Sequence, residues 1–242
     1  GIAGAILLVP GYVEGPLLAL SAVSTGGMGP RSDSLASYPS AAQTFLILLS
    51  MVGAISLAFP VLAKRRGILT AVRSSALTSV LKLVLFGVFA CIVFNILSGV
   101  RSPAEIWHSV LTLLSLQSTT GFTIGAVPGP SPFFILLIVL MVIGGQTGST
   151  AGGLKIDRVR VLFRTVAFMF RRLLSPIKAV LYLRIDGEIV EPERMVFTMA
   201  LVVAYVATTV CLWIAFALHG LPLASSLFDI VSALSTVGAG TG

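Results

Sequence analysis

Ser115-Leu116-Gln117-Ser118-Thr119-Thr120-Gly121 lies near the middle of this 242-residue chain, at the end of a moderately apolar segment, residues 103–117. The ungapped pattern Ser-x-x-Ser-Thr-x-Gly occurs twice more, in residues 21–27 and 232–238. Both of those copies also end a moderately apolar segment that is too short to cross a membrane. An internal repeat at spacings of 94 and 117 residues indicates that a structural unit has been duplicated.

Long apolar segments with few charges surround these three strings. Residues 41–63, 76–97 and 193–218 are each long enough, at 1.5 Å per residue, to cross a hydrocarbon layer of about 30 Å. Residues are 56% hydrophobic and only 10% charged, which is well under half the charged share of a soluble domain. The two-residue alternation of apolar and polar residues that is typical of barrel strands is missing. The backbone N–H and C=O groups must therefore form their hydrogen bonds within helices. The sequence therefore predicts an all-α polytopic membrane protein and excludes a soluble globule.

Positive charge is concentrated in two segments, which by the positive-inside rule face the cytoplasm. Twelve of the sixteen Lys and Arg residues are Lys64, Arg65, Arg66, Arg73, Lys155, Arg158, Arg160, Arg164, Arg171, Arg172, Lys178 and Arg184. We therefore expect residues 64–73 and 154–192 inside, and residues 98–102 and 125–130 outside, a multi-pass protein of the cytoplasmic membrane. No basic segment and no methionine precede the first apolar residues, so we expect the chain to be a fragment.

A glycine-rich interruption divides a further apolar segment. Residues 133–143 are too short to span, and they run into Gly144, Gly145, Gln146, Thr147, Gly148, Ser149, Thr150, Ala151, Gly152 and Gly153. Glycine costs roughly 1 kcal/mol relative to alanine inside a helix, so five of them predict a break. The basic residues after the break have a helical pattern, and we expect residues 132–174 to form one inward helix with a broken middle. Asp186-Gly187 then predicts the turn of a short cytoplasmic hairpin.

The repeated strings favour cation binding by the backbone. Non-helical backbone at membrane depth is tolerated only where protein buries it or water lines it. Threonine and a small residue before glycine allow an alternately left- and right-handed backbone, so that successive carbonyls point at one axis and replace the hydration shell of a cation. The preceding half-helix directs the negative end of its dipole to the same place. Tight helix packing by Ser, Thr and Gly is the alternative, and three copies weigh against it.

The three strings, above all Thr236-Val237-Gly238, and residues 144–155 resemble the superfamily of Trk, Ktr and HKT potassium transporters, and most closely its bacterial TrkH/KtrB membrane subunits. The resemblance covers essentially the whole chain. It implies a potassium-channel-like fold, in which four units of span, re-entrant pore helix, filter strand and span surround a central pore. A first repeat is not present, and the sequence stops at Gly242, before the closing span of the fourth.

The resemblance also implies the following division of the chain. Residues 1–63 are the second pore repeat, with pore helix 11–23, filter 24–28 and span 41–63. Residues 64–174 are the third, with span 76–97, pore helix 103–117, filter 118–122 and broken span 132–174. Residues 175–192 are a cytoplasmic connector, and residues 193–242 are the fourth repeat, with span 193–218, pore helix 222–234 and filter 235–239.

Potassium uptake through a carbonyl-lined filter is the function that this resemblance implies. The filter residues carried over are Thr25, Gly26, Gly27, Thr119, Thr120, Gly121, Thr236, Val237 and Gly238, and residues 144–153 are the intramembrane gating loop. Potassium would be held by backbone carbonyls, with no cofactor and no covalent chemistry, so an enzyme is not implied. The partners would be membrane lipid, a second copy of the chain and cytosolic nucleotide-binding regulatory subunits, without nucleic acid.

Two alternatives stay open at this stage. A sodium-permeable member of the superfamily would carry serine in place of a filter glycine, and the absent first repeat could hold the deciding residue. A membrane-embedded enzyme or phosphate-binding component could use the glycine-rich loop, but residues 148–155 lack the Gly-Lys-[Ser/Thr] order of a phosphate-binding loop and follow no predicted strand. Asp229, inside the last pore helix, either stiffens the filter by hydrogen bonding or lends it negative potential.

Overall fold

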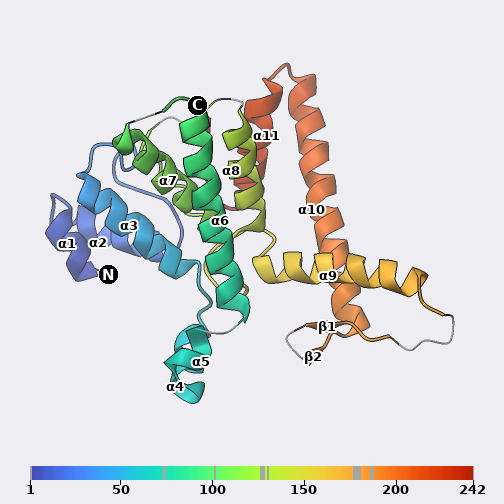
Figure 1. The fold of residues 1–242 in the computed structure, drawn as a ribbon. Helices are drawn as coiled ribbons and strands as arrows, with labels where there is room; N and C mark the ends of the chain where they lie inside the picture. Colours follow the sequence, from blue (N-terminus) through green and yellow to red (C-terminus); the bar gives the residue numbers. More distant parts are fainter. Residues whose placement is uncertain are drawn as a thin grey trace.

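The computed structural model describes residues 2–72, 75–100, 102–125, 129, 131–176, 181–185 and 188–241, and they are mostly helical. Figure 1 shows α6, α8 and α10 running in roughly the same direction, with shorter helices packed between and beside them. Arg73, Ala126, Lys178 and the predicted Asp186-Gly187 turn lie outside the described residues.

The first repeated unit contains α1 (Ile2–Leu8), α2 (Glu14–Val23) and α3 (Ser40–Gly53), followed by α4 (Phe59–Arg66) and α5 (Ile68–Val72). The sequence predicted one unbroken segment over residues 41–63, and the structure differs because α3 ends at Gly53. The carbonyls of Gly53 and Ala54 accept hydrogen bonds from the N–H groups of Thr150 and Gln146, at 3.3 and 3.0 Å, instead of continuing the helix. Pro60, in the first turn of α4, has no N–H and suits a new helix start.

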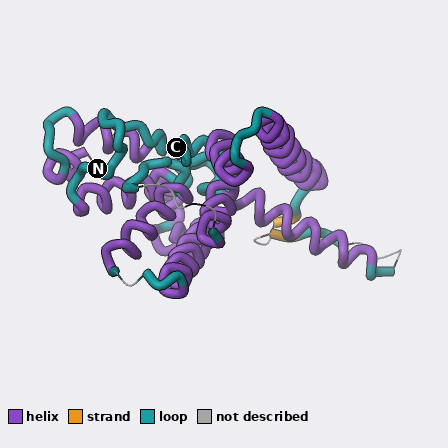
Figure 2. Tube along the Cα trace, turned by 90° about the horizontal axis from the view of Figure 1, so that it is seen from above, coloured by secondary structure: helices purple, strands orange, loops and turns teal. Residues whose placement is uncertain are grey.

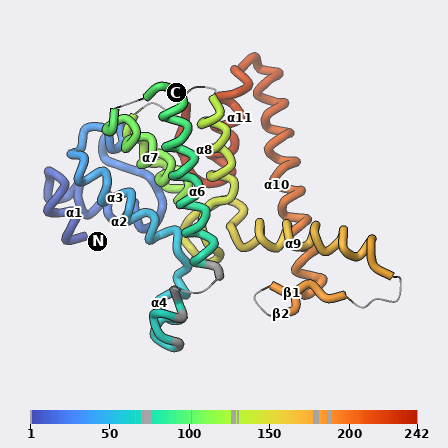
Figure 3. The backbone as a smooth tube through the Cα atoms, in the orientation of Figure 1, coloured from blue at the N-terminus to red at the C-terminus, as the bar shows by residue number. Residues whose placement is uncertain are grey.

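The second unit contains α6 (Ser75–Leu97), α7 (Pro103–Gln117), α8 (Pro132–Ile143) and α9 (Ile156–Leu173). The predicted short helix over residues 103–117 and the predicted break after residue 143 both coincide with these bounds. Residues 132–174 do not form one helix with a broken middle, however. The tube in Figure 3 descends along α8, turns through the glycine-rich loop and continues into α9, which runs in a different direction from α8.

The third unit contains α10 (Pro192–Leu218) and α11 (Leu223–Leu234), which lie side by side. A two-stranded antiparallel sheet of β1 (Arg184–Ile185) and β2 (Glu188–Ile189) precedes α10, with Arg184 opposite Ile189. In Figure 1 this hairpin and the helices α4 and α5 lie toward the lower end of the molecule, whereas the connections α6 to α7 and α10 to α11 lie at the upper end.

The core surrounds α7, which contacts α3, α6 and α8. Its last two turns, residues 110–117, are buried on every side, which is typical of a helix in the middle of a protein. Two aromatic pairs close the core around it: Phe94 stacks on Phe133 and Phe134 on Phe228, with ring centroids 5.8 and 5.1 Å apart. The string that follows α7 is therefore held at the centre of the structure.

Two helices in the described part of the chain are long and apolar enough to cross a membrane, Leu77–Leu97 and Pro192–Leu218. Within α10 Thr198 is the one buried residue, and large apolar side chains such as Val196 and Val203 are each 67% exposed. An apolar surface of this extent suits hydrocarbon or another protein better than water.

Candidate functional site

All three repeated strings share one backbone conformation. Their fifth residue is a threonine and their seventh a glycine, and both have positive φ in every copy. The values are 51° and 64° for Thr25 and Gly27, 56° and 77° for Thr119 and Gly121, and 57° and 76° for Thr236 and Gly238. Positive φ costs a residue with a side chain about 1–2 kcal/mol, and for a β-branched residue it is rare. Its recurrence at one register shows a conformation built into the repeat.

Each string folds back onto the helix that precedes it. The sixth residue donates its N–H to the carbonyl of the first serine, at 2.9 Å from Gly26 to Ser21, 3.0 Å from Thr120 to Ser115 and 2.8 Å from Val237 to Ser232. In two copies the hydroxyl of the first serine also donates to the carbonyl of the residue that follows the string, from Ser115 to Phe122 at 2.7 Å and from Ser232 to Ala239 at 2.6 Å. Helix and string therefore form one unit in each repeat.

The strings lie next to one another in the order of the sequence. A Cβ on Gly27 would meet the carbonyl of Thr120, and a Cβ on Gly121 would meet the carbonyl of Val237, both far closer than the 3.0 Å that real Cβ contacts respect. Each glycine thus packs against the backbone of the next string. At Gly238 no described atom lies within 4 Å of a Cβ, so that side is open.

The middle string is the most enclosed. Ser118, Thr119 and Thr120 have no exposed surface, whereas in the outer strings Gly26 and Gly238 are exposed. Hydroxyls from neighbouring helices hold the fourth residue of two strings. Ser118 Oγ shares a 3.0 Å hydrogen bond with Ser50 Oγ of α3, and Ser235 Oγ shares a 2.8 Å bond with the Tyr205 hydroxyl of α10. Nothing in the local sequence links Ser50 or Tyr205 to the strings, so only the tertiary structure identifies these two residues.

The glycine-rich loop lies against the middle of all three strings. Thr150 Oγ1 donates to the carbonyl of Val23 in the first string at 3.0 Å, and Gly152 N donates to Thr119 Oγ1 of the second at 2.6 Å. A Cβ on Gly152 would meet the carbonyl of Ser235 in the third string. Glycine is needed here because two backbones approach closely.

The loop is also tied to the break between α3 and α4. Ser56 N donates to Gln146 Oε1 at 2.8 Å, and Leu57 N donates to the carbonyl of Gly148 at 2.9 Å. At the far end of the loop, Lys155 Nζ donates to the carbonyls of Ala151 and Ser149. In the sequence Lys155 belongs to the basic segment, and in the structure its ammonium group stabilises the shape of the loop. The preceding element is the helix α8, which excludes the strand of a phosphate-binding loop.

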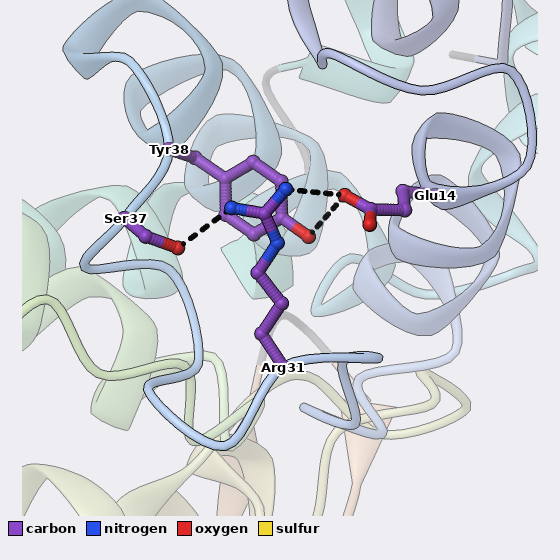
Figure 4. A network of polar contacts seen from close by, with 4 residues as sticks. All are labelled: Glu14, Arg31, Ser37 and Tyr38. Atoms are coloured by element: carbon purple, nitrogen blue, oxygen red, sulfur yellow. Dashed lines mark hydrogen bonds and ion pairs between the residues drawn. The ribbon is translucent and has the colours of Figure 1, made fainter.

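A polar cluster holds the segment that follows the first string (Figure 4). Arg31 donates to Glu14 Oε2 at 3.0 Å and to Ser37 Oγ at 3.0 Å, and its guanidinium lies 4.4 Å from the centroid of the Tyr38 ring. Tyr38 donates its hydroxyl to the same Glu14 oxygen at 2.8 Å. Burial of the ring, with the Glu14 carboxylate beside it, raises the pKa of Tyr38 to about 12, so the hydroxyl keeps its proton. Glu14 therefore joins the start of α2 to the loop after its string.

Asp229 makes a corresponding link in the last unit. Its Oδ1 accepts a hydrogen bond of 3.0 Å from Thr241 N and one of 3.3 Å from Thr241 Oγ1. Of the two roles considered for Asp229, the geometry favours hydrogen bonding that stiffens the segment after the string. Within the described residues, His, Cys, Asp and Glu form no cluster of three that could hold a metal ion.

Known proteins resemble this chain in sequence and in fold. A family model described as TrkH, cation transport protein, matches residues 67–242. The chain is 27% identical over 231 residues to an uncharacterized cation transporter of Methanocaldococcus jannaschii, covering 93% of this chain and 46% of that protein. It is 27% identical over 179 residues to the Trk system potassium uptake protein TrkH of Halomonas elongata, covering 72% of this chain and 36% of that protein.

A solved structure has the same fold. The crystal structure of the potassium transporter TrkH from Vibrio parahaemolyticus superposes with a TM-score of 0.85 at 20% identity, over 96% of this chain and 51% of that one. The chain thus spans about half or less of the length of the proteins that it matches.

Proposed function

This chain belongs to the TrkH family of cation transport proteins, and on that basis we propose that it lines a potassium-selective path across the cytoplasmic membrane. The family is one of membrane transporters and not of enzymes. The alternative of a membrane-embedded enzyme that uses the glycine-rich loop is therefore set aside.

The observation that carries the proposal is the threefold recurrence of one strained backbone conformation in adjacent strings. Alternation between left-handed and ordinary φ turns successive carbonyls toward the same side of a strand, as cation coordination requires. Gly27 and Gly121 pack on the carbonyls of the neighbouring strings, so the three strings form consecutive parts of one wall. We place a further string of the same kind on the open side of Gly238, which would complete a ring of four.

The proposed organisation follows the repeats. Residues 1–63, 64–174 and 193–242 each supply a pore helix and a filter string, and residues 175–192 connect the last two of these units on the cytoplasmic side. The coincidence of α2, α7 and α11 with the segments before the strings supports this division.

Potassium is the proposed cation, in preference to sodium. All three strings have glycine at the seventh position, where a side chain would withdraw a carbonyl. Several oxygens of moderate field strength favour the larger ion, which is easier to dehydrate. The relative from Halomonas elongata bears the name of a potassium uptake protein.

Residues 144–153 are the proposed gate. The bonds from Thr150 to Val23 and from Gly152 to Thr119 each contribute about 0.5–1.5 kcal/mol net, so releasing both costs only about 1–3 kcal/mol. A loop with five glycines can then move away from the strings without breaking a helix. From the family resemblance we further propose a homodimer with cytosolic nucleotide-binding regulatory subunits.

Ion flux tests the proposal directly. The full-length protein, reconstituted in vesicles, should take up potassium and rubidium in preference to sodium by about tenfold or more, which corresponds to about 1.4 kcal/mol. Equal uptake of sodium would contradict the assignment of the ion, and vesicles without cation flux would contradict the path itself. Empty vesicles and vesicles with heat-denatured protein are the controls.

A further inference from the structure

Helix α9 lies across the ends of two spanning helices and has two different faces. It contacts α6 and α10, and in Figures 1 and 2 it extends sideways from them. Phe163, Phe170 and Leu173 recur at helical spacing on one face, and they are 71%, 64% and 81% exposed. Arg164 and Arg171 occupy another face, also at helical spacing. An exposed apolar face beside a basic one is typical of a helix at a membrane surface.

A cavity of about 230 Å³ opens between the basic face of α9 and the chain around β1. Three arginines line it, Arg164 and Arg171 from α9 and Arg184 from β1. The other described lining residues are Ala167, Phe168, Tyr182 and Leu183, and none of these described residues is acidic. Tyr182 is 64% exposed and adds a hydroxyl that can donate a hydrogen bond.

Among the side chains that the structure describes, no acidic group forms an ion pair with the arginines of this cavity. The ion pairs among the described residues join Arg31 to Glu14 and Arg160 to Asp157, and neither pair includes an arginine of the cavity. Asp157 is the acidic residue of α9, and its second oxygen already accepts a 3.0 Å hydrogen bond from Thr147 N. Three guanidinium groups around one cavity repel each other unless an anion lies between them.

We infer that this cavity binds a phosphate-bearing anion. Guanidinium groups present paired N–H donors that match phosphate oxygens, and their charge is permanent at physiological pH. The Tyr182 hydroxyl can complete the set of donors. Two sources have this chemistry, the headgroup of an anionic phospholipid, which the apolar face of α9 would bring close, and a soluble phosphate compound. In either case the anion would tie α9, which directly follows the glycine-rich loop, to the hairpin before α10.

Anion binding to the purified full-length protein tests the inference without any ion flux, so its outcome is independent of the proposed cation path. One arm uses nanodiscs of phosphatidylcholine with and without phosphatidylglycerol, and native mass spectrometry counts the phosphatidylglycerol retained. The other arm measures binding of radiolabelled pyrophosphate to protein in neutral detergent. The variants are Arg171→Gln and Arg184→Gln, with Arg172→Gln as the matched control, since Arg172 is an exposed α9 arginine that does not line the cavity.

Binding should weaken about tenfold in Arg171→Gln and Arg184→Gln and stay within about twofold of wild type in Arg172→Gln. This pattern in nanodiscs identifies a lipid headgroup, and the same pattern with pyrophosphate identifies a soluble ligand. Absence of binding in both arms, or an equal loss in Arg171→Gln and Arg172→Gln, would overturn the inference. Thermal unfolding checks that each variant is folded. If Arg171→Gln does not fold, Arg184→Gln still tests the cavity, because Arg184 lies on a different element.

Discussion

Two adjacent glycines in the first string, Gly26 and Gly27, should differ in how well they tolerate substitution by alanine. Gly27 has a φ of +64°, and a Cβ there would collide with the carbonyl of Thr120. Gly26 has no positive φ, and its Cβ would meet Ser24 Oγ at an ordinary 3.4 Å. The equivalent positions in the other strings hold Thr120 and Val237, so a side chain is compatible with this register. Gly27→Ala should therefore disturb the site, and Gly26→Ala should not.

The size of the effect follows from the geometry. The left-handed conformation costs alanine about 1–2 kcal/mol, and relief of the collision requires the first and second strings to separate by about 1 Å. A 100-fold preference for potassium is only about 2.7 kcal/mol, so a strain of 1–2 kcal/mol can reduce it about 5–30-fold. At Gly26 alanine should be neutral or stabilise the protein by up to about 1 kcal/mol, because it restricts the unfolded chain.

The assay is the ratio of potassium to sodium uptake by the full-length protein in vesicles, at equal protein content, together with the thermal unfolding midpoint. We expect a lower ratio and a lower midpoint for Gly27→Ala, and wild-type values for Gly26→Ala. If Gly27→Ala keeps the wild-type ratio in a folded protein, the first string does not line the path. If both variants lose selectivity equally, the contact between Gly27 and Thr120 is not the cause.

Three other perturbations test the surroundings of the strings. Shortening residues 146–152 should raise the rate of potassium uptake in vesicles, because it removes the loop that lies against the strings. An unchanged rate in a folded variant would mean that the loop contributes to packing and not to gating. Glu14→Gln should lower the unfolding midpoint by about 1–4 °C and weaken the salt dependence of that midpoint, since a partly exposed ion pair with Arg31 contributes about 0.5–1 kcal/mol. A midpoint equal to that of wild type would show that the cluster around Glu14 and Arg31 does not stabilise the protein. Asp229→Ala should reduce the potassium to sodium uptake ratio more than Asp229→Asn, which keeps an acceptor for Thr241 N, and equal ratios in the two variants would argue for a purely electrostatic role.

Local sequence was sufficient for the elements whose limits depend on neighbouring residues. Helix α7 begins at Pro103, which suits a first turn, and ends at Gln117, the third residue of the string. Helix α6 coincides with a predominantly apolar segment, and α8 ends where five glycines enter the chain within ten residues. The mostly helical class of membrane protein likewise follows from composition, since 10% charged residues cannot cover a soluble surface.

Tertiary contacts decided the rest, because residues far apart in the chain compete for the same backbone groups. Residues 41–63 carry no charge and are mainly apolar, yet α3 ends at Gly53. The glycine-rich loop, more than 90 residues later, donates to the carbonyls that a longer helix would use. The threonine and glycine of each string indicated an unusual backbone, but their spacing could not say that Gly27 meets Thr120 or that Gly121 meets Val237. Local pattern determines which conformations a segment can adopt at low cost, and only packing between segments determines which carbonyls lie side by side.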